Sequence, residues 1–143
     1  MATSNAATNY LERRLLHYIF KNDSLSFSSP GDNIYVGLAT AVSAAETGSL
    51  TEATFTNYGR KRVTASGWTT VGSDSTDTQT AKNTAAIDFD ASGGTNNTIT
   101  HVFIADQLTG GNILFVGALD ASKAIASGDI FRINAGNLTI ELK

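Results

Sequence analysis

Turn residues divide the C-terminal part of the chain at short intervals. The run from Gly110 to Leu142 reads GGNILFVGALDASKAIASGDIFRINAGNLTIEL, and Gly, Asn and Asp interrupt its apolar stretches. It ends on strict alternation, with apolar residues at Leu138, Ile140 and Leu142. Alternation with period two predicts half-buried strands, and the frequent turns predict that these strands are antiparallel. The run contains no obvious nucleophile, metal cluster or phosphate loop, which favours a structural role over a catalytic one.

The composition of the chain favours β structure in one domain. Its 143 residues are enough to bury a sizeable core, and one domain is the default at this length. Charged residues make up only 16% of the chain, while roughly a fifth of the residues are Ser or Thr. Because Thr is β-branched, it fits a pleated sheet better than a helix. We therefore expect a mainly β protein with a largely neutral, hydroxyl-rich surface.

Charge and cysteine content exclude several classes of partner and site. A net charge of -3 gives no general attraction to nucleic acid or to anionic lipid, so we expect neither nucleic acid nor a membrane as a partner. The chain has no Cys, which excludes disulfides and thiolate metal sites. No apolar stretch approaches the roughly 20 residues that span a bilayer, and no signal peptide is recognisable. We expect a chain made in the cytoplasm without export.

One segment near the N-terminus has the periodicity of a helix. Residues 5–21 read NAATNYLERRLLHYIFK, and an apolar stripe with spacing i, i+4, i+7 and i+8 consists of Leu11, Leu15, Tyr18 and Ile19. The basic side chains fall largely on the other side, at Arg13, Arg14, His17 and Lys21. Thr8 or Asn9 is suited to cap the helix, which is expected to end before Asn22.

This amphipathic helix allows two interpretations. It can cover an open end or edge of its own sheet, or it can dock on a neighbouring subunit. We favour the first, because most amphipathic helices pack on their own domain. The predicted organisation is an N-terminal helix or arm over residues 1–22 and a β domain over residues 23–143.

The rest of the chain shows short apolar or alternating runs separated by turn signals. The segment 39–54 has many small residues and weak periodicity, which suits an exposed loop or extended arm better than a core element, so we assign it to no strand or helix. Residues 65–82 are interpreted as a polar connection anchored by Trp68. Roughly six to eight short strands predict an antiparallel β-sandwich or jelly roll with one N-terminal amphipathic α-helix. The predicted strands are residues 33–38, 55–64, 84–89, 99–105, 113–119, 130–133 and 138–142.

Residues that could carry catalysis are few. The chain has two His residues, His17 and His101, and neither has the spacing of a zinc site. We expect His101 to be a partly buried side chain bonded to backbone. No serine lies in a Gly-x-Ser-x-Gly elbow, and few aromatic residues are present to bind a sugar. The sequence therefore predicts no enzyme, no metal and no cofactor, with a carbohydrate-active enzyme as the least favoured alternative.

Two acidic groups and one basic cluster remain. Asp88 and Asp90 share one strand face, and Asp74 and Asp77 lie in a loop. Both groups lack the ligand series of a calcium loop, so we expect solvated carboxylates. The run 60–62, Arg-Lys-Arg, is the one concentrated positive patch. It lacks the interleaved aromatic residues of a nucleic-acid site, so a solvated strand face or a contact with an acidic subunit is the preferred interpretation.

Seven short motifs follow one another along nearly the whole chain. They are NYLERRLLHYIF at 9–20, YVGLAT at 35–40, YGRKRVT at 58–64, NTAAIDF at 83–89, THVFIAD at 100–106, GGNILFVGAL at 110–119 and SGDIFRINAGNLTIEL at 127–142. Each motif is weak alone, but their joint order resembles a widespread family of small bacteriophage virion proteins commonly labelled tail-fibre-like. The chain departs from that family in segment 39–54, which lacks a D-P-rich turn, and at Gly37 and Gly59, where other members often carry Ala.

The resemblance implies a non-enzymatic phage structural protein with a β-sandwich. Some similar virion proteins are trimeric jelly-roll cement on icosahedral capsids, and others are assigned to tails. The few charges on this chain favour burial against other subunits, because little water must be removed from charged groups.

We therefore predict a capsid cement or decoration protein on the outer capsid surface, with the major capsid protein and its own copies in a homotrimer as partners. The alternative is a tail fibre or tail-tip component that contacts the host surface. Candidate protein-interface residues are Tyr10, Arg13, Arg14, His17, Arg60, Lys61 and Arg62.

Overall fold

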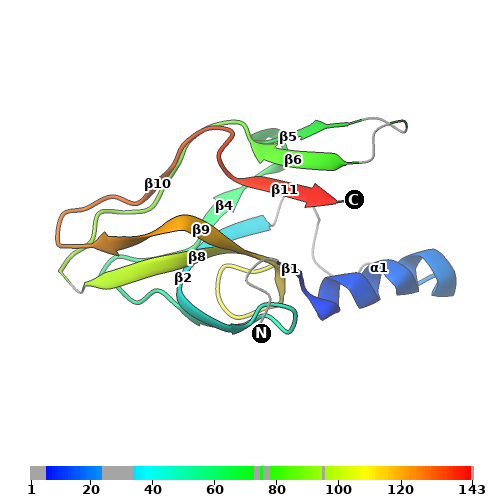
Figure 1. The fold of residues 1–143 in the computed structure, drawn as a ribbon, viewed down its shortest axis with the longest axis horizontal. Coiled ribbons are helices and arrows are strands. Elements are labelled where there is room, and N and C mark those ends of the chain that lie inside the picture. Colours follow the sequence, from blue (N-terminus) through cyan, green and yellow to red (C-terminus); the bar gives the residue numbers. More distant parts are fainter. Residues whose placement is uncertain (1–5, 24–33, 73–74, 76–77, 95, 143) are drawn as a thin grey trace.

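The protein is mainly β with one helix (Figure 1). The computed structural model describes residues 6–23, 34–72, 75, 78–94 and 96–142. Its helix α1 spans Asn9–Lys21, and a short 3-10 turn spans Ala65–Gly67. The strands are β1 (Ala6–Ala7), β2 (Ile34–Ala44), β3 (Ser49–Glu52), β4 (Lys61–Val63), β5 (Trp68–Val71), β6 (Gln79–Asn83), β7 (Ile87–Asp88), β8 (Asn97–Ala105), β9 (Ile113–Ile125), β10 (Arg132–Ile133) and β11 (Thr139–Leu142).

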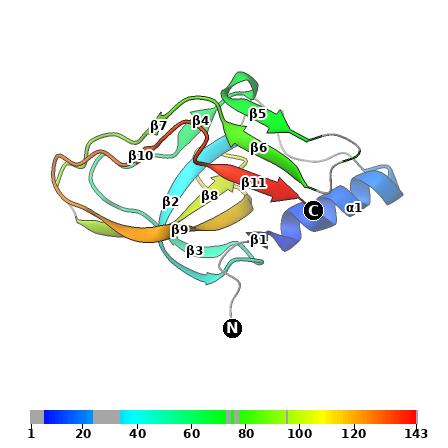
Figure 2. The ribbon, with the colours of Figure 1, turned by 45° about the horizontal axis from the view of Figure 1, so that its top comes forward.

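The strands form one large sheet and two small ones, all antiparallel. The large sheet has six strands in the order β1-β9-β8-β2-β3, with β4 also paired to β2. A two-stranded sheet joins β10 to β7, and a three-stranded sheet has the order β11-β6-β5. Figures 1 and 2 show the curled large sheet with β5, β6 and β11 on one side of it.

Apolar side chains pack on both faces of the large sheet. Successive strand residues point to opposite faces, so Val102 and Phe103 of β8 enter different clusters. Val102 belongs to the larger cluster, which also includes Ile87 of β7 and Ile133 of β10. This cluster therefore lies between the large sheet and the two-stranded sheet. Phe103 belongs to a smaller cluster of mainly small residues on the other face.

The predicted class of a mainly β fold with one helix is confirmed, while the finer assignment to a sandwich or jelly roll stays a prediction. The buried strand predicted at 99–105 is β8, with its last four residues buried. The terminal alternation predicted at 138–142 corresponds to β11, which pairs with β6. These two strands were recognisable because apolar continuity and period-two alternation are local signals.

Segment 39–54, which its composition suited to an exposed loop or arm, belongs instead to the large sheet. Its residues complete β2 and form the hairpin with β3, and Ala39, Ala45 and Ala53 are buried. Alanine has little apolar surface and weak β propensity, so this segment has no strong local signal. Its burial is decided by packing beneath larger side chains such as Phe103, which is distant in the sequence.

Two further connections also differ from expectation. The strand expected over 55–64 is limited to β4, because Asn57 adopts a left-handed backbone (φ 74) in the turn that precedes it. Residues 65–82, expected as a polar connection, supply β5 and β6, which pair with each other. Trp68 does anchor this region, since it packs against the larger core cluster.

Gly37 is required by a close approach between β2 and β8. Gly37 is paired with Phe103 across the two strands, and a Cβ at position 37 would overlap the Phe103 ring. We expect Gly37→Ala to lower the free energy of unfolding by about 1–3 kcal/mol, because an extra methyl group overpacks the site.

Urea denaturation of Gly37→Ala measures this loss of stability. Gly59→Ala is the control, because a Cβ at Gly59 meets no atom within 4 Å. In the double variant Gly37→Ala/Phe103→Leu, the smaller side chain should recover part of the loss. Equal stability of the two single alanine variants would contradict the close approach.

Candidate protein-interaction site

The N-terminus of α1 is fixed to the large sheet. Ala6 and Ala7 pair with β9, and the Thr8 hydroxyl donates a hydrogen bond to the Ile113 carbonyl at 2.6 Å. The same Thr8 oxygen accepts the Leu11 amide at 3.4 Å, so Thr8 is the N-cap. The Asn9 amide donates to the Glu46 carbonyl at 2.6 Å. These bonds set the direction in which the helix leaves the body.

The apolar stripe of α1 does not pack on its own domain. No helix residue is buried, and the large apolar side chains are 45–75% exposed at Leu15, Leu16, Tyr18, Ile19 and Phe20. Figures 1 and 2 show α1 projecting beyond one end of the β body. The preferred interpretation, in which the helix covers its own sheet, is therefore wrong. The helix itself and its end before Asn22 are confirmed, with Asn22 in a left-handed C-cap (φ 57).

The candidate interface residues on the helix have different surroundings. Arg13 is exposed, whereas Tyr10, Arg14 and His17 are half-buried. The Arg14 guanidinium lies 5.4 Å from the centre of the Tyr10 ring, and His17 Nδ1 lies 2.9 Å from the Asp23 carboxylate. Their role at an interface stays a prediction. The exposed apolar side chains of α1 are stronger candidates for contact with another subunit than these polar residues. The apolar stripe in the sequence already indicated them.

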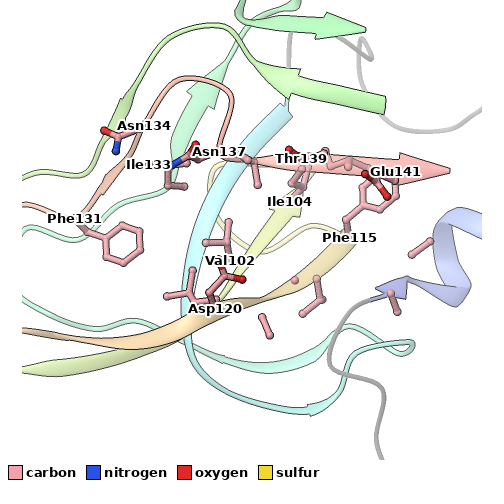
Figure 3. A pocket seen from close by; sticks show the side chains of 18 of the residues that line it. Val102, Ile104, Phe115, Asp120, Phe131, Ile133, Asn134, Asn137, Thr139 and Glu141 are labelled. Atoms are coloured by element: carbon pink, nitrogen blue, oxygen red, sulfur yellow. The ribbon is translucent and has the colours of Figure 1, made fainter. Parts of the chain in front are cut away.

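A groove of about 720 Å³ opens between β9 and β11 (Figure 3). Its floor and walls are mostly apolar, and Phe115, Leu119 and Ile140 are each only half-buried. Leu142 at the end of β11 is 54% exposed. Among the described strands, none pairs with this edge of β11, and only the two residues of β1 pair with this edge of β9, which leaves the groove between them. It also contains exposed carboxylates, which the close-up shows on Asp120 and Glu141.

The structure removes Arg60 from the candidate interface. Arg60 is 9% exposed and holds the Glu52 carboxylate with two hydrogen bonds of 2.9 Å. Its remaining nitrogen donates to the carbonyls of Gln107 and Gly110, at 2.7 and 2.8 Å. The guanidinium also covers the Phe103 ring at 5.0 Å. The prediction of a solvated or partner-facing Arg60 is wrong, because these long-range partners satisfy the buried charge.

Lys61 and Arg62 lie on β4, and their role at an interface stays a prediction. Lys61 is bound to the Asp90 carboxylate at 2.8 Å. Asp88 likewise forms two bonds with Arg132, at 2.6 and 2.7 Å, and these bonds lower the pKa of the Asp88 carboxyl. The second acidic pair, Asp74 and Asp77, lies outside the described residues. Within the described residues no three His, Asp or Glu side chains gather as they do at a metal site.

Buried polar side chains organise the loops that carry the sequence motifs. Asp106 is 4% exposed and accepts hydrogen bonds from the amide and side chain of Asn112, at 2.7 and 2.9 Å. Asn83 is 2% exposed and binds the backbone of Ala85, Asn134 and Leu138. Sequence reasoning missed these roles, although Asp and Asn are typical of turns that a side chain closes by a hydrogen bond to backbone.

His101 is partly buried, as expected, but its Nδ1 lies 2.8 Å from the Thr100 hydroxyl and not from a backbone atom. Burial lowers the pKa of its imidazole below the ordinary 6.5. The unfolded chain therefore binds this proton more readily, and stability is expected to fall as the pH drops below 6.5.

His101→Gln should lose less stability than the natural chain between about pH 7.5 and about pH 5.5, measured by urea denaturation at each pH. His17→Gln is the control, since it keeps the imidazole at position 101. If the natural chain and His101→Gln lose equal stability over this range, His101 is not the cause.

Comparison with known protein families accounts for the ordered motifs. Residues 6–141 match the family described as Gp80, podophage GP4 fiber I protein gp80. This match places the protein in the class of bacteriophage virion structural proteins. It belongs to the Gp80 family, because the match spans both the helix and the β body. No curated protein matches the chain. In the described part of the chain, no helix is long and apolar enough to cross a membrane.

Proposed function

We propose that this protein is a non-enzymatic fibre subunit of a phage virion and that α1 attaches it to neighbouring subunits. The match of residues 6–141 to a family described as a fibre protein supports the fibre assignment. The observation that carries the attachment role is the helix, whose apolar side chains face solvent while its base is fixed to the sheet. Exposed apolar patches of this kind mark protein contact sites.

A β-sandwich body with a homotrimeric assembly is part of this proposal. The larger apolar cluster lies between the large sheet and the small sheets, as the core of a sandwich does. Closed symmetric assembly is the common route by which one chain buries an exposed apolar surface.

Capsid cement is the second candidate function. In that case the partner is the major capsid protein, and the sparsely charged surface favours it, since few charges lose water when a shell subunit covers them. Both candidates require α1 to contact another chain, and they differ in where the protein sits on the virion.

Copy number and position separate the two functions. Quantitative mass spectrometry of purified virions should give far fewer copies of this protein than of the major capsid protein if it is a fibre subunit. Gold-labelled antibody should then mark the tail or fibres. A copy number comparable with that of the major capsid protein, with label over the whole shell, would refute the fibre assignment and support cement.

A further inference from the structure

We propose that the groove between β9 and β11 binds the helix α1 of a second copy of this chain. The proposal rests on the assembly role proposed above and names the partner of that helix. The described residues form two apolar surfaces that the chain leaves partly open to solvent, one convex on α1 and one concave in the groove. The convex surface consists of Leu15, Leu16, Tyr18, Ile19 and Phe20, and the concave one includes Phe115, Leu119, Leu138, Ile140 and Leu142.

The helix cannot reach the groove of its own chain. Ala6 and Ala7 line the end of the groove while they pair with β9, and Thr8 and Asn9 are bonded to the backbone of Ile113, Leu114 and Glu46. The chain therefore leaves the groove at its end, and α1 continues away from the body (Figures 1 and 2). Turning α1 back would break the bonds that fix its base. A neighbouring copy can instead present its groove to the projecting helix.

Charge favours a second copy as the occupant. At 100° per residue, Arg13 lies at one border of the apolar face beside Phe20, and Arg14 lies at the other border beside Tyr18. Glu12 lies on the same face but in the first turn of the helix, at its fixed base. The groove has a carboxylate on each wall, Asp120 on β9 and Glu141 on β11. Among the described residues neither carboxylate is paired with a cation. A helix lying in the groove would place basic side chains along both acidic walls, which sets its orientation.

Gly117 shows how the groove can be closed without disturbing the fold. It lies on β9 in the groove lining, and a Cβ built there meets no atom within 4 Å. Gly117→Gln should therefore fill the groove and leave the packing intact. Gly59→Gln is the matched control, because it also adds a side chain into open space, at a position that does not line the groove.

Complementation between two variants tests the proposal. The helix variant is Leu15→Gln/Ile19→Gln, and the groove variant is Gly117→Gln. Sedimentation of the purified natural chain and of Gly59→Gln should show self-association. Each of the two interface variants alone should associate at least about tenfold more weakly. Their mixture should form a one-to-one complex, because one supplies the intact helix and the other the intact groove.

Three results would overturn the proposal. These are a monomeric natural chain, a groove variant that self-associates as the natural chain does, and a mixture that stays monomeric. The second would indicate that helices pair with each other. Because purified protein is used without virions, any of these leaves the fibre assignment intact.

Cross-linking provides a second measurement that is independent of the folding of these variants. The chain has no Cys, so Ile19→Cys can be combined with Leu142→Cys or Gly117→Cys in the groove. A short thiol cross-linker should join two chains in these variants. It should not do so in Ile19→Cys/Ser127→Cys, because residue 127 lies in the turn between β9 and β10. Equal cross-linking in all of them would refute docking in the groove.

Discussion

Arg60→Ala is expected to lower the free energy of unfolding by about 3 kcal/mol, because it leaves buried partners without their donor. The side chain joins Glu52, the last residue of β3, to the carbonyls of Gln107 and Gly110 in the β8–β9 loop. The expected loss stands at the low end for a buried ion pair, since the Glu52 side chain is 31% exposed. Urea denaturation followed by circular dichroism measures it.

Two other variants identify the cause of this loss. Arg60→Lys keeps the charge but not the planar fork, so most of the loss should remain. Arg132→Ala removes a similar two-bond contact with Asp88, but both of those side chains are largely exposed, at 58% and 45%. It should shift the unfolding midpoint far less. Similar losses for Arg60→Ala and Arg132→Ala would mean that burial and the loop carbonyls do not matter.

The helix variant Leu15→Gln/Ile19→Gln is expected to prevent incorporation into virions while leaving the fold stable. Leu15 and Ile19 are 45% and 58% exposed, so the free energy of unfolding should change by less than about 0.5 kcal/mol. Glutamine is also a good helix former, so the helix should persist. Phage carrying the variant gene would be purified, and the protein in the particles quantified by mass spectrometry against the major capsid protein.

The matched control is Leu108→Gln/Ile130→Gln. These side chains are as exposed, at 53% and 56%, but they belong neither to the helix nor to the groove lining. Virions should take up this control as they take up the natural protein. Normal incorporation of the helix variant would show that the apolar face of α1 is not the attachment surface.

The basic run at 60–62 shows where sequence reasoning about the site reached its limit. Three consecutive cations have no local signal that separates a structural residue from a surface residue. In the structure Arg60 turns toward Glu52 and the Phe103 ring, while Lys61 reaches Asp90. Arg60 and Gly110 are 50 residues apart, so their contact depends on the pairing of β2 with β4 and β8. Such a role is visible only when distant strands are placed together.

The groove was beyond sequence analysis for a similar reason. The alternation at the C-terminus correctly predicted one apolar face on the last strand, and β11 turns that face toward β9. An alternating strand normally indicates burial in the core of its own domain. In the described part of the chain, β11 and the part of β9 beyond β1 are not paired with each other, and this follows from sheet order, which local patterns do not encode.

The sequence by itself determined the β class, the helix with its ends, the main buried strand and the phage family. These depend on neighbouring residues, through periodicity, capping and turn chemistry, or on the order of motifs along the chain. Only the tertiary structure decided that α1 turns its apolar face to solvent, that Arg60 is buried and that three alanines of segment 39–54 enter the core. Which face is covered depends on contacts between residues far apart in the chain, and amphipathicity alone does not say what covers it.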